Sequence, residues 1–176
     1  MDLQRVNVVG VSGSGKSSFS RRLAALLDAP YLEMDALFWD PNWTEPPDEV
    51  FFERVRNAVG AERWVLDGNY SRTQSIKWPR TTSVIWLDYT LPIALRRVIT
   101  RTLARVATGR ELWAGNRESW RTLFSRKSIV LWTLTTHARK RRDYTQAMSD
   151  PDWAQLRFIR LRTPAEAERF LRSLAV

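Results

Sequence analysis

Short apolar runs alternate along the chain with longer stretches in which apolar residues recur every three or four positions. The short runs predict β-strands, because a strand buried on both faces of a sheet needs about four to eight consecutive apolar residues. The longer stretches predict amphipathic helices between the strands. This alternation is typical of βαβ units, so we expect an α/β fold whose parallel sheet is covered by helices on both faces.

The predicted elements cover most of the chain. Strands are expected at residues 6–9, 31–34, 64–66, 84–87 and 156–161. Helices are expected at residues 16–27, 48–59, 92–107 and 164–174, with a further basic helix at about 117–148. The connection at 108–116 contains two glycines, and we expect it to be mobile. With 176 residues, the chain fits one domain, residues 1–176.

The composition narrows the classes of protein that need to be considered. Hydrophobic residues make up 44% of the chain and charged residues 27%, which is typical of a folded globular protein. The sequence has no cysteine, which excludes disulfides, thiolate metal sites and a cysteine nucleophile. It contains no signal-peptide pattern and no apolar run of the roughly 20 residues that span a bilayer. We therefore expect a cytoplasmic protein with no membrane partner.

The positive charge is concentrated in one part of the chain. The formal net charge is +9, and the segment 91–145 carries 13 Lys and Arg residues against 3 acidic ones. A block of this kind faces polyphosphate or nucleic acid, unless it is only a solvated helix surface.

The segment Gly10–Ser17 carries the most specific motif in the sequence. It reads GVSGSGKS and matches G-x-x-x-x-G-K-[ST], the loop whose backbone N–H groups surround the phosphates of ATP or GTP. Lys16 is expected to reach the β- and γ-phosphates, and Ser17 to place its hydroxyl on Mg²⁺. The expected nucleotide-binding residues are Gly10, Ser12, Gly13, Ser14, Gly15, Lys16, Ser17 and Ser18. The motif indicates which ligand is bound, and the reaction must be argued from other residues.

Three aspartates follow predicted strands and are candidates for the chemistry. Asp67 precedes a Gly-Asn turn and is the favoured second anchor for Mg²⁺, whereas Asp88 resembles a residue that starts a helix. Asp35 ends the second predicted strand, and ligands collect at the carboxyl ends of parallel strands. Asp35 could accept a proton from an acceptor hydroxyl or help to hold Mg²⁺, but it could also cap a helix or turn.

A row of arginines predicts a cationic face. Arg97, Arg101 and Arg105 recur every four residues and therefore lie on one side of a helix. With the arginines of the following segment, they suggest a lid that closes over the nucleotide and neutralises charge on the transferring phosphoryl group. The arginines of that following segment are Arg110, Arg117 and Arg121. The alternative is an ordinary solvated cationic face.

The tryptophans and the single histidine differ in what they predict. Trp64 and Trp86 lie in predicted strands and are most simply core residues. Trp39 and Trp43 lie in a proline-rich stretch after Asp35, where they could stack on the ring of a substrate or simply pack. His137 has no neighbouring metal-ligand partner in the sequence, so we assign it no chemistry.

With these features in place, the chain resembles the adenylate kinase-like branch of P-loop kinases, and within it the bacterial proteins labelled DNA topology modulation proteins. Besides the phosphate loop, the likeness is carried by segments 31–35, 64–70, 109–113 and 115–118. It implies a three-layer fold with a five-stranded parallel sheet in the order 2-3-1-4-5. It also implies a lid at about 108–120, phosphoryl transfer from ATP with Mg²⁺, and a loop at 162–164 near the adenine.

The chain departs from true adenylate kinases on the acceptor side. Those enzymes carry an arginine just after the second strand to hold a monophosphate, whereas this chain has Asp35 there. An aspartate at that place resembles kinases of shikimate, gluconate and nucleosides, in which a neutral hydroxyl must be oriented and relieved of its proton. The acceptor is then an alcohol, unless Arg54, Arg56 or Arg72 replaces the missing phosphate clamp.

The sequence as a whole favours ATP-dependent phosphoryl transfer to a small acceptor, a nucleotide or nucleoside. In this interpretation Lys16, Asp35, Arg101, Arg105 and Arg110 are catalytic, and Ser17 and Asp67 hold the metal. Alternatives are a hydroxyl-acceptor kinase of the shikimate or gluconate type, an ATP-switched regulator that binds nucleic acid, and a P-loop hydrolase without a small acceptor.

Overall fold

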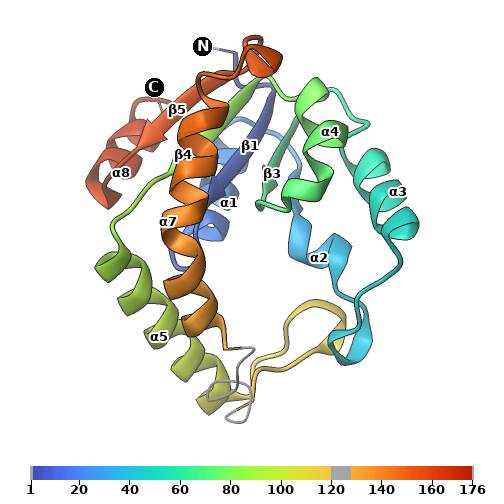
Figure 1. Ribbon diagram of the computed structural model, residues 1–176, viewed down its shortest axis with the longest axis vertical. Helices are drawn as coiled ribbons and strands as arrows, with labels where there is room; N and C mark the ends of the chain where they lie inside the picture. The colour runs from blue at the N-terminus through green and yellow to red at the C-terminus, as the bar shows by residue number, and fades with distance from the viewer. Residues whose placement is uncertain (1, 120–127, 176) are drawn as a thin grey trace.

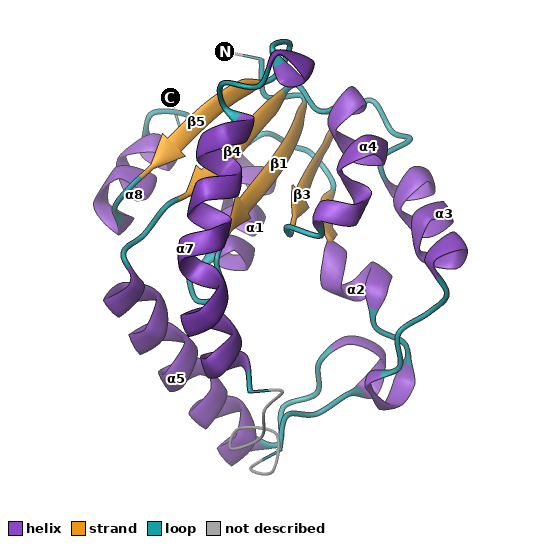
Figure 2. Ribbon diagram, in the orientation of Figure 1, coloured by secondary structure: helices purple, strands orange, loops and turns teal. Residues whose placement is uncertain are grey.

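Five parallel strands form the centre of the computed structural model, which describes residues 2–119 and 128–175 (Figures 1 and 2). The strands are β1 (Arg5–Gly10), β2 (Tyr31–Glu33), β3 (Trp64–Asp67), β4 (Ser83–Leu87) and β5 (Arg157–Leu161). Their order in the sheet is β2-β3-β1-β4-β5, and every neighbouring pair is parallel. This arrangement confirms the predicted fold class and the predicted strand order.

The register brings the ends of the strands to one edge of the sheet. In β1, Val8 pairs with Asp67 of β3 on one side and with Ile85 of β4 on the other. Glu33, the last residue of β2, pairs with Asp67 as well. Because all strands run the same way, their carboxyl ends and the loops that follow them collect at the same edge.

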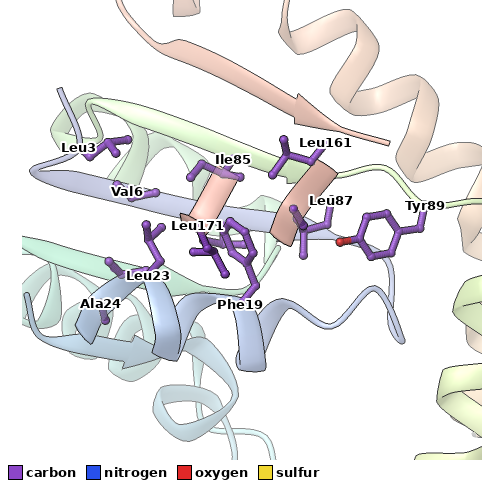
Figure 3. Close-up of a cluster of buried hydrophobic side chains, with 13 residues drawn as sticks. Leu3, Val6, Phe19, Leu23, Ala24, Ile85, Leu87, Tyr89, Leu161 and Leu171 are labelled. Atoms are coloured by element: carbon purple, nitrogen blue, oxygen red, sulfur yellow. The ribbon is translucent and has the colours of Figure 1, made fainter. Parts of the chain in front are cut away.

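Seven helices of the described residues surround the sheet. They are α1 (Lys16–Leu26), α2 (Met34–Phe38), α3 (Asp48–Ala58), α4 (Gln74–Lys77), α5 (Leu91–Thr108), α7 (Ile129–Ala147) and α8 (Pro164–Arg172). Helices α1 and α8 cover one face of the sheet. Figure 3 shows Phe19 and Leu23 of α1 and Leu171 of α8 against Val6 of β1 and Ile85 of β4.

The opposite face is covered by two groups of helices. Val9 points to this face because side chains alternate along a strand, and it packs with Trp86 of β4 and Tyr144 of α7. Further along the sheet, Trp64 and Leu66 of β3 pack against α2 and α3. Trp64 and Trp86 are 0% and 2% exposed, which confirms their prediction as core residues.

Some predicted boundaries are wrong for identifiable reasons. The second strand ends at Glu33, since Met34 begins α2, so Asp35 lies in a one-turn helix and does not end a strand. The basic helix begins at Ile129 and not at about residue 117, because Ser128 caps it by accepting a hydrogen bond from the N–H of Val130. Residues 117–119 are not helical, and residues 120–127 lie outside the described part. The short helices α2 and α4 were not predicted.

Within residues 2–119 and 128–175, none of the helices combines the length and the apolar character that crossing a membrane demands.

Candidate functional site

The phosphate loop connects the end of β1 to the start of α1. Its backbone is closed by a bond from the N–H of Ser14 to the carbonyl of Val11 (3.2 Å). Helix α1 begins at Lys16, so the unpaired N–H groups of its first turn face the loop, as an anion-binding helix start requires. The Nζ of Lys16 donates to the carbonyl of Val11 (3.2 Å), across the concave side of the loop.

Gly13 is fixed by a close approach between the loop and α5. It has a φ of +81°, and a Cβ built on it would overlap the carbonyl of Ala94 in α5. Only glycine suits both conditions, so the loop and the helix that carries the arginines are locked together at this point.

Lys16 and Asp67 form the electrostatic centre of the site. Burial lowers the pKa of Lys16, and the nearby carboxylates of Asp67 and Asp35 oppose this shift. Burial likewise raises the pKa of Asp67, opposed by the charge of Lys16 and by a hydrogen bond from Ser17. Asp67 is 4% exposed and also accepts a hydrogen bond from the hydroxyl of Tyr31 (3.2 Å). The lysine, the serine and the carboxylate of the predicted metal site therefore lie together.

Asp67 has the property that a magnesium anchor needs. Its Oδ1 is buried and has no hydrogen-bond partner among the described residues, although buried polar atoms usually have one. Ser17 lies beside it, and a hydroxyl and a carboxylate are the oxygen ligands that Mg²⁺ accepts. The described residues contain no group of three or more His, Asp or Glu side chains that could hold a metal alone. The residues present thus fit a metal that is bound mainly through a nucleotide.

The sequence suggested that Asp88 starts a helix, but the structure gives it a different role. Its Oδ2 accepts two bonds from Arg160 (2.9 and 2.6 Å) and lies 3.3 Å from Arg141. The N-cap position of α5 is occupied by Thr90, whose side chain makes no capping hydrogen bond. Two arginines therefore neutralise Asp88, which leaves Asp67 as the better placed carboxylate for Mg²⁺.

Asp35 lies on α2, close to Lys16 and Asp67. Its Oδ1 accepts a hydrogen bond from the hydroxyl of Tyr70 (2.5 Å). Its carboxylate also raises the pKa of Tyr70, although burial is the larger cause. No side-chain cap is made at the start of α2, where Glu33 is the N-cap residue. The structure thus places Asp35 near the phosphate loop and gives it no capping role.

The arginines of α5 turn toward the phosphate loop. Arg97 donates to the carbonyl of Ser14 (3.2 Å), and Arg101 donates to the hydroxyl of Ser12 (3.2 Å). Burial is the main cause that lowers the pKa of Arg101. Arg105 pairs with Glu118 at 2.8 Å, with side chains only 19% and 15% exposed.

The remaining lid arginines have different surroundings. Arg110 lies on the wall of the large cavity beside the phosphate loop. Arg117 is exposed and pairs with Glu111 at 2.6 Å, which balances its charge outside the cavity. Arg121 lies outside the described residues.

A cavity of about 1150 Å³ joins these elements. It is lined by the phosphate loop and α1, by the arginine face of α5, by the lid, and by the start of α8. The predicted site residues on its wall are Gly13, Ser14, Gly15, Lys16, Ser17, Ser18, Arg101, Arg105 and Arg110. Gly10, Ser12, Asp35 and Asp67 do not line it. Pro164, in the loop expected near the adenine, also lines the cavity.

The turn after β3 contacts the phosphate loop through Asn69. Its Oδ1 accepts from the N–H of Gly10 (3.0 Å), and its Nδ2 donates to the carbonyl of Gly10 (2.8 Å). The hydroxyl of Tyr144 on α7 also donates to Oδ1 (3.0 Å). The sequence indicated this turn as the support of Asp67 and as a point of likeness to other kinases. It gave no role to the Asn69 side chain, because no local pattern reveals a bond across 59 residues.

Two buried polar residues support the same turn and were missed. Asn7 of β1 donates to the carbonyls of Leu66 (3.1 Å) and Gly68 (3.2 Å). Lys77 is 0% exposed, and its Nζ donates to the carbonyls of Gly68 (3.4 Å) and Asn69. The signal for Asn7 was available, because an amide in the middle of an apolar strand needs buried partners.

The aromatic candidates pack on one another. Trp39 meets Trp43 edge to face with ring centroids 5.3 Å apart, and Trp43 meets Trp113 of the lid at 6.4 Å. His137 is buried on α7 with its Nε2 3.0 Å from the carbonyl of Tyr89. This contact with the backbone accounts for the buried position of His137.

The sheet order, the phosphate loop and the helices around them define the fold of P-loop kinases. Over 97% of its length, the chain superposes on a shikimate kinase from Bacteroides thetaiotaomicron, covering 96% of that protein, with a TM-score of 0.55 and 14% identity. Over 98% of its length, it superposes on a gluconokinase from Sinorhizobium meliloti, covering 94% of that protein, with a TM-score of 0.51 and 19% identity.

Among curated proteins, a cytidylate kinase from Rhodopirellula baltica is similar in sequence. The two are 28% identical over 130 residues, which cover 68% of this chain and 56% of the relative. The matched part is thus little more than half of that relative's length. No protein-family model matches the chain.

Proposed function

We propose that this protein is a small-molecule kinase that transfers the γ-phosphoryl group of ATP to a nucleotide or nucleoside. In the reaction the bond from the γ-phosphorus to the bridging oxygen breaks, a bond to an acceptor oxygen forms, and ADP leaves. The similarity to a cytidylate kinase supports a nucleotide-type acceptor. The shared fold of shikimate kinases and a gluconokinase supports a kinase architecture. The likeness to DNA topology modulation proteins adds no reaction to this proposal.

One observation carries the proposal. The phosphate-loop lysine, a buried carboxylate and an arginine-bearing helix converge beside a cavity of about 1150 Å³. Ligand pockets measure roughly 300–1,000 Å³, so this cavity has room for a nucleotide together with a small acceptor. A protein that only bound ATP would not need the second part of this space.

The chain's own residues contribute positioning and charge. Phosphoryl transfer spreads negative charge over the oxygens of the transferring group, and fixed cations stabilise that charge. Lys16 belongs to the phosphate loop, Arg101 bonds to Ser12 of the same loop, and Arg110 also lines the cavity. Arg105 lines the same cavity, although Glu118 partly balances its charge. We propose that residues 108–120 form a lid that brings Arg110 over the nucleotide.

Ser17 and Asp67 would hold Mg²⁺ with the nucleotide. The unpartnered, buried Oδ1 of Asp67 fits this role, since a water molecule of the metal shell would satisfy it. When bound, Mg²⁺ would supply positive charge that offsets the charge of the nucleotide's phosphates. Before the metal binds, the positive charge of Lys16 balances the negative charge of the Asp67 carboxylate.

We propose that Asp35 orients the acceptor. Its carboxylate lies close to Lys16, and Tyr70 fixes its orientation by donating to Oδ1 (2.5 Å). The second carboxylate oxygen can then accept the proton of an acceptor hydroxyl as the new bond forms.

A hydroxyl acceptor, as in kinases of the shikimate or gluconate type, is favoured by a separate observation. Two of the arginines that could have held an acceptor phosphate already have acidic partners. Arg54 pairs with Asp40 at 2.9 Å, and Arg72 pairs with Asp48 at 2.8 Å. A carboxylate beside each guanidinium reduces the charge left for a phosphate.

The experiment is acceptor-dependent formation of ADP. The purified protein is incubated with Mg·ATP and, one at a time, CMP, cytidine, other nucleosides and monophosphates, shikimate and gluconate. We expect one class to accelerate ADP formation, and Lys16→Ala to abolish the acceleration. ADP formed equally without any acceptor would make the protein a hydrolase and overturn the proposal.

The role of Asp35 is tested with the accelerating acceptor. We expect Asp35→Asn to lower kcat by about 10²–10⁴, the usual contribution of a general base. Full activity in this variant would remove Asp35 from the mechanism, while leaving kinase activity itself intact.

A further inference from the structure

Two loops beyond the carboxyl edge of the sheet are joined by one buried amide. The first is the acceptor-side segment, residues 39–44 after α2, and the second is the lid segment, residues 109–118 after α5. Figure 1 shows them side by side, away from the sheet, in cyan and yellow. Asn116 lies between them and is only 4% exposed. Its Oδ1 accepts from the N–H of Trp43 (2.7 Å), and its Nδ2 donates to the carbonyl of Asp40 (2.9 Å).

The third polar contact of Asn116 lies within its own segment. Its Nδ2 also donates to the carbonyl of Trp113 (2.9 Å). The side chain therefore uses one acceptor and both donors on backbone groups of the two loops. Aspartate has the same shape but no donor, and it would place a charged oxygen against two carbonyl oxygens. The contact is thus specific for an amide.

Aromatic packing reinforces the contact. The indole N–H of Trp43 donates to the carbonyl of Arg117 (3.2 Å), and its ring packs edge to face against Trp39 and Trp113. The two segments thus meet through side chains as well as through the amide. The contact is a built interface between parts of the chain about 70 residues apart.

The backbone is strained on both sides of this contact. Asn42, Trp43 and Ala114 have φ values of 62°, 56° and 53°, in the left-handed region that side chains other than glycine rarely adopt. Such conformations persist where surrounding contacts hold them, and they cluster at functional sites. Backbone bonds within each turn and the bonds of Asn116 and Trp43 between the turns hold them here.

The lid segment is held on its other side by α5. Glu118 pairs with Arg105 at 2.8 Å, and Arg105 lies over the ring of Trp113 with its guanidinium carbon 5.9 Å from the ring centre. The same segment carries Arg110 and Trp113, both on the cavity wall. Releasing one attachment would let the cavity-lining part of the lid move away.

We propose that Asn116 is a positioning residue that pins the lid to the acceptor-side segment, so that Arg110 stands over the cavity only while both loops are joined. The inference rests on the proposed function, since it takes one side of the cavity as the nucleotide side and the other as the acceptor side. When a ligand occupies one side of the cavity, closure over the other side is favoured as well, because both segments share the Asn116 contact.

The test measures the distance between the two segments without any substrate. The sequence has no cysteine, so Thr44→Cys and Ala114→Cys give two specific sites for spin labels. Ala114 already carries a Cβ, so cysteine adds no new backbone strain there. We expect pulsed EPR to show one narrow distance distribution, and Asn116→Asp to broaden it and move it to longer distances. Asn57→Ala, at an exposed asparagine of α3, is the matched control.

A second readout separates positioning from folding. Asn116→Asp is expected to weaken binding of Mg²⁺ with a non-hydrolysable ATP analogue by about tenfold, which corresponds to one lost hydrogen-bond network. The midpoint of thermal unfolding should fall by no more than about 4 °C, because the contact lies outside the sheet core. Trp43→Phe removes the bond to Arg117 and reduces the ring packing, but it keeps the bonds of Asn116. It should give a smaller change in both the distance distribution and the affinity.

The outcomes distinguish this inference from the proposed function. A distance distribution that Asn116→Asp leaves unchanged overturns the pin, whether or not the protein is a kinase. A broadened distribution with weaker analogue binding supports it, even if no acceptor in the panel is phosphorylated. A broadened distribution with unchanged affinity overturns it as well, because the contact would then position nothing at the cavity.

Discussion

At the scale of single residues, the site depends on charges that are buried close to one another. Lys16 and Asp67 each lose solvation on burial, and each is stabilised by the other. Ser17 completes this group by donating to Asp67. Removing the charge of Asp67 alone would leave Lys16 without its largest stabilising partner, and would remove the candidate metal anchor.

The first prediction concerns Asp67→Asn, which keeps the shape of the side chain and removes its charge. We expect the Mg²⁺ concentration needed for half-maximal nucleotide binding to rise by about 10–100-fold, the usual cost of losing a group that supports a metal. Calorimetric titration of the nucleotide at a series of Mg²⁺ concentrations measures this directly.

The matched control is Asp88→Asn. Asp88 is equally buried but pairs with Arg160. This variant should change stability while the Mg²⁺ dependence stays that of the wild type. Equal Mg²⁺ dependence in both variants would show that Asp67 does not support the metal.

Lys77 presents a different electrostatic situation. It is 0% exposed, and in the described residues its Nζ bonds only to the carbonyls of Gly68 and Asn69. Burial lowers the pKa of Lys77 to about 7, with a further contribution from the charge of Lys140. A lysine in the unfolded chain keeps its ordinary pKa of 10.5.

The second prediction is the pH dependence of stability that follows from Lys77. Between these two pKa values the unfolded chain binds more protons than the folded chain, so the stability contributed at this site rises with pH. We expect the free energy of unfolding of the wild type, relative to Lys77→Met, to grow by up to about 1 kcal/mol per pH unit above about pH 7. Urea unfolding of both proteins at about pH 7 and about pH 9 measures the difference.

The control for Lys77 is Arg56→Met, which removes an exposed cation whose charge does not titrate in this range. Its stability relative to the wild type should be the same at both pH values. A difference between wild type and Lys77→Met that does not change with pH would mean that Lys77 stays protonated in the folded protein.

At the scale of elements, the turn after β3 connects three parts of the site. Asp67 faces Lys16, Asn69 bonds to the backbone of Gly10, and Tyr70 bonds to Asp35. Three residues of one turn thus reach Lys16, the phosphate loop and Asp35, the proposed acceptor-orienting residue. A displacement of this turn would disturb all three together.

The third prediction tests this turn through Asn69→Ala. The variant leaves the N–H and the carbonyl of Gly10 without their partners, at a cost of roughly 1–3 kcal/mol for a buried group. We expect affinity for Mg·ATP to fall by about tenfold or more, measured by calorimetry. Asn57→Ala should bind as the wild type does, and equal affinity in Asn69→Ala would mean that the phosphate loop keeps its shape without this bond.

The elements that the sequence predicted well are those with long, regular patterns. The apolar runs of β1 and β4 and the periodic stretch of α5 were found within one or two residues, because burial on both faces or on one face leaves a clear pattern. The phosphate loop was found because its glycines and Lys16 obey a fixed spacing. Nine-residue α8 was found from its proline and its apolar spacing.

The parts that sequence reasoning missed depend on contacts between distant residues. The start of the basic helix was placed about twelve residues too early, since the polar pattern continues through the lid and only Ser128 marks the cap. Asn116 and Lys77 act through partners that no local spacing reveals. Short helices such as α2 are stabilised by packing and not by propensity, so their sequences carry a weak signal.

At the scale of the whole molecule, part of the positive charge of the basic segment lines the cavity. Arg97, Arg101 and Arg105 lie on its wall, and Arg101 and Arg105 are half-buried there. These arginines concentrate positive potential beside the phosphate loop, where a nucleotide's phosphates would lie, as a kinase requires.

The most direct test of the central claim is transfer of the labelled γ-phosphoryl group of ATP. The protein is incubated with Mg²⁺, γ-labelled ATP and each small acceptor, and the products are separated so that labelled acceptor and labelled inorganic phosphate are counted apart. The account predicts label on one class of acceptor in the wild type and none with Lys16→Ala. Label that appears only as inorganic phosphate, whatever acceptor is present, would contradict it.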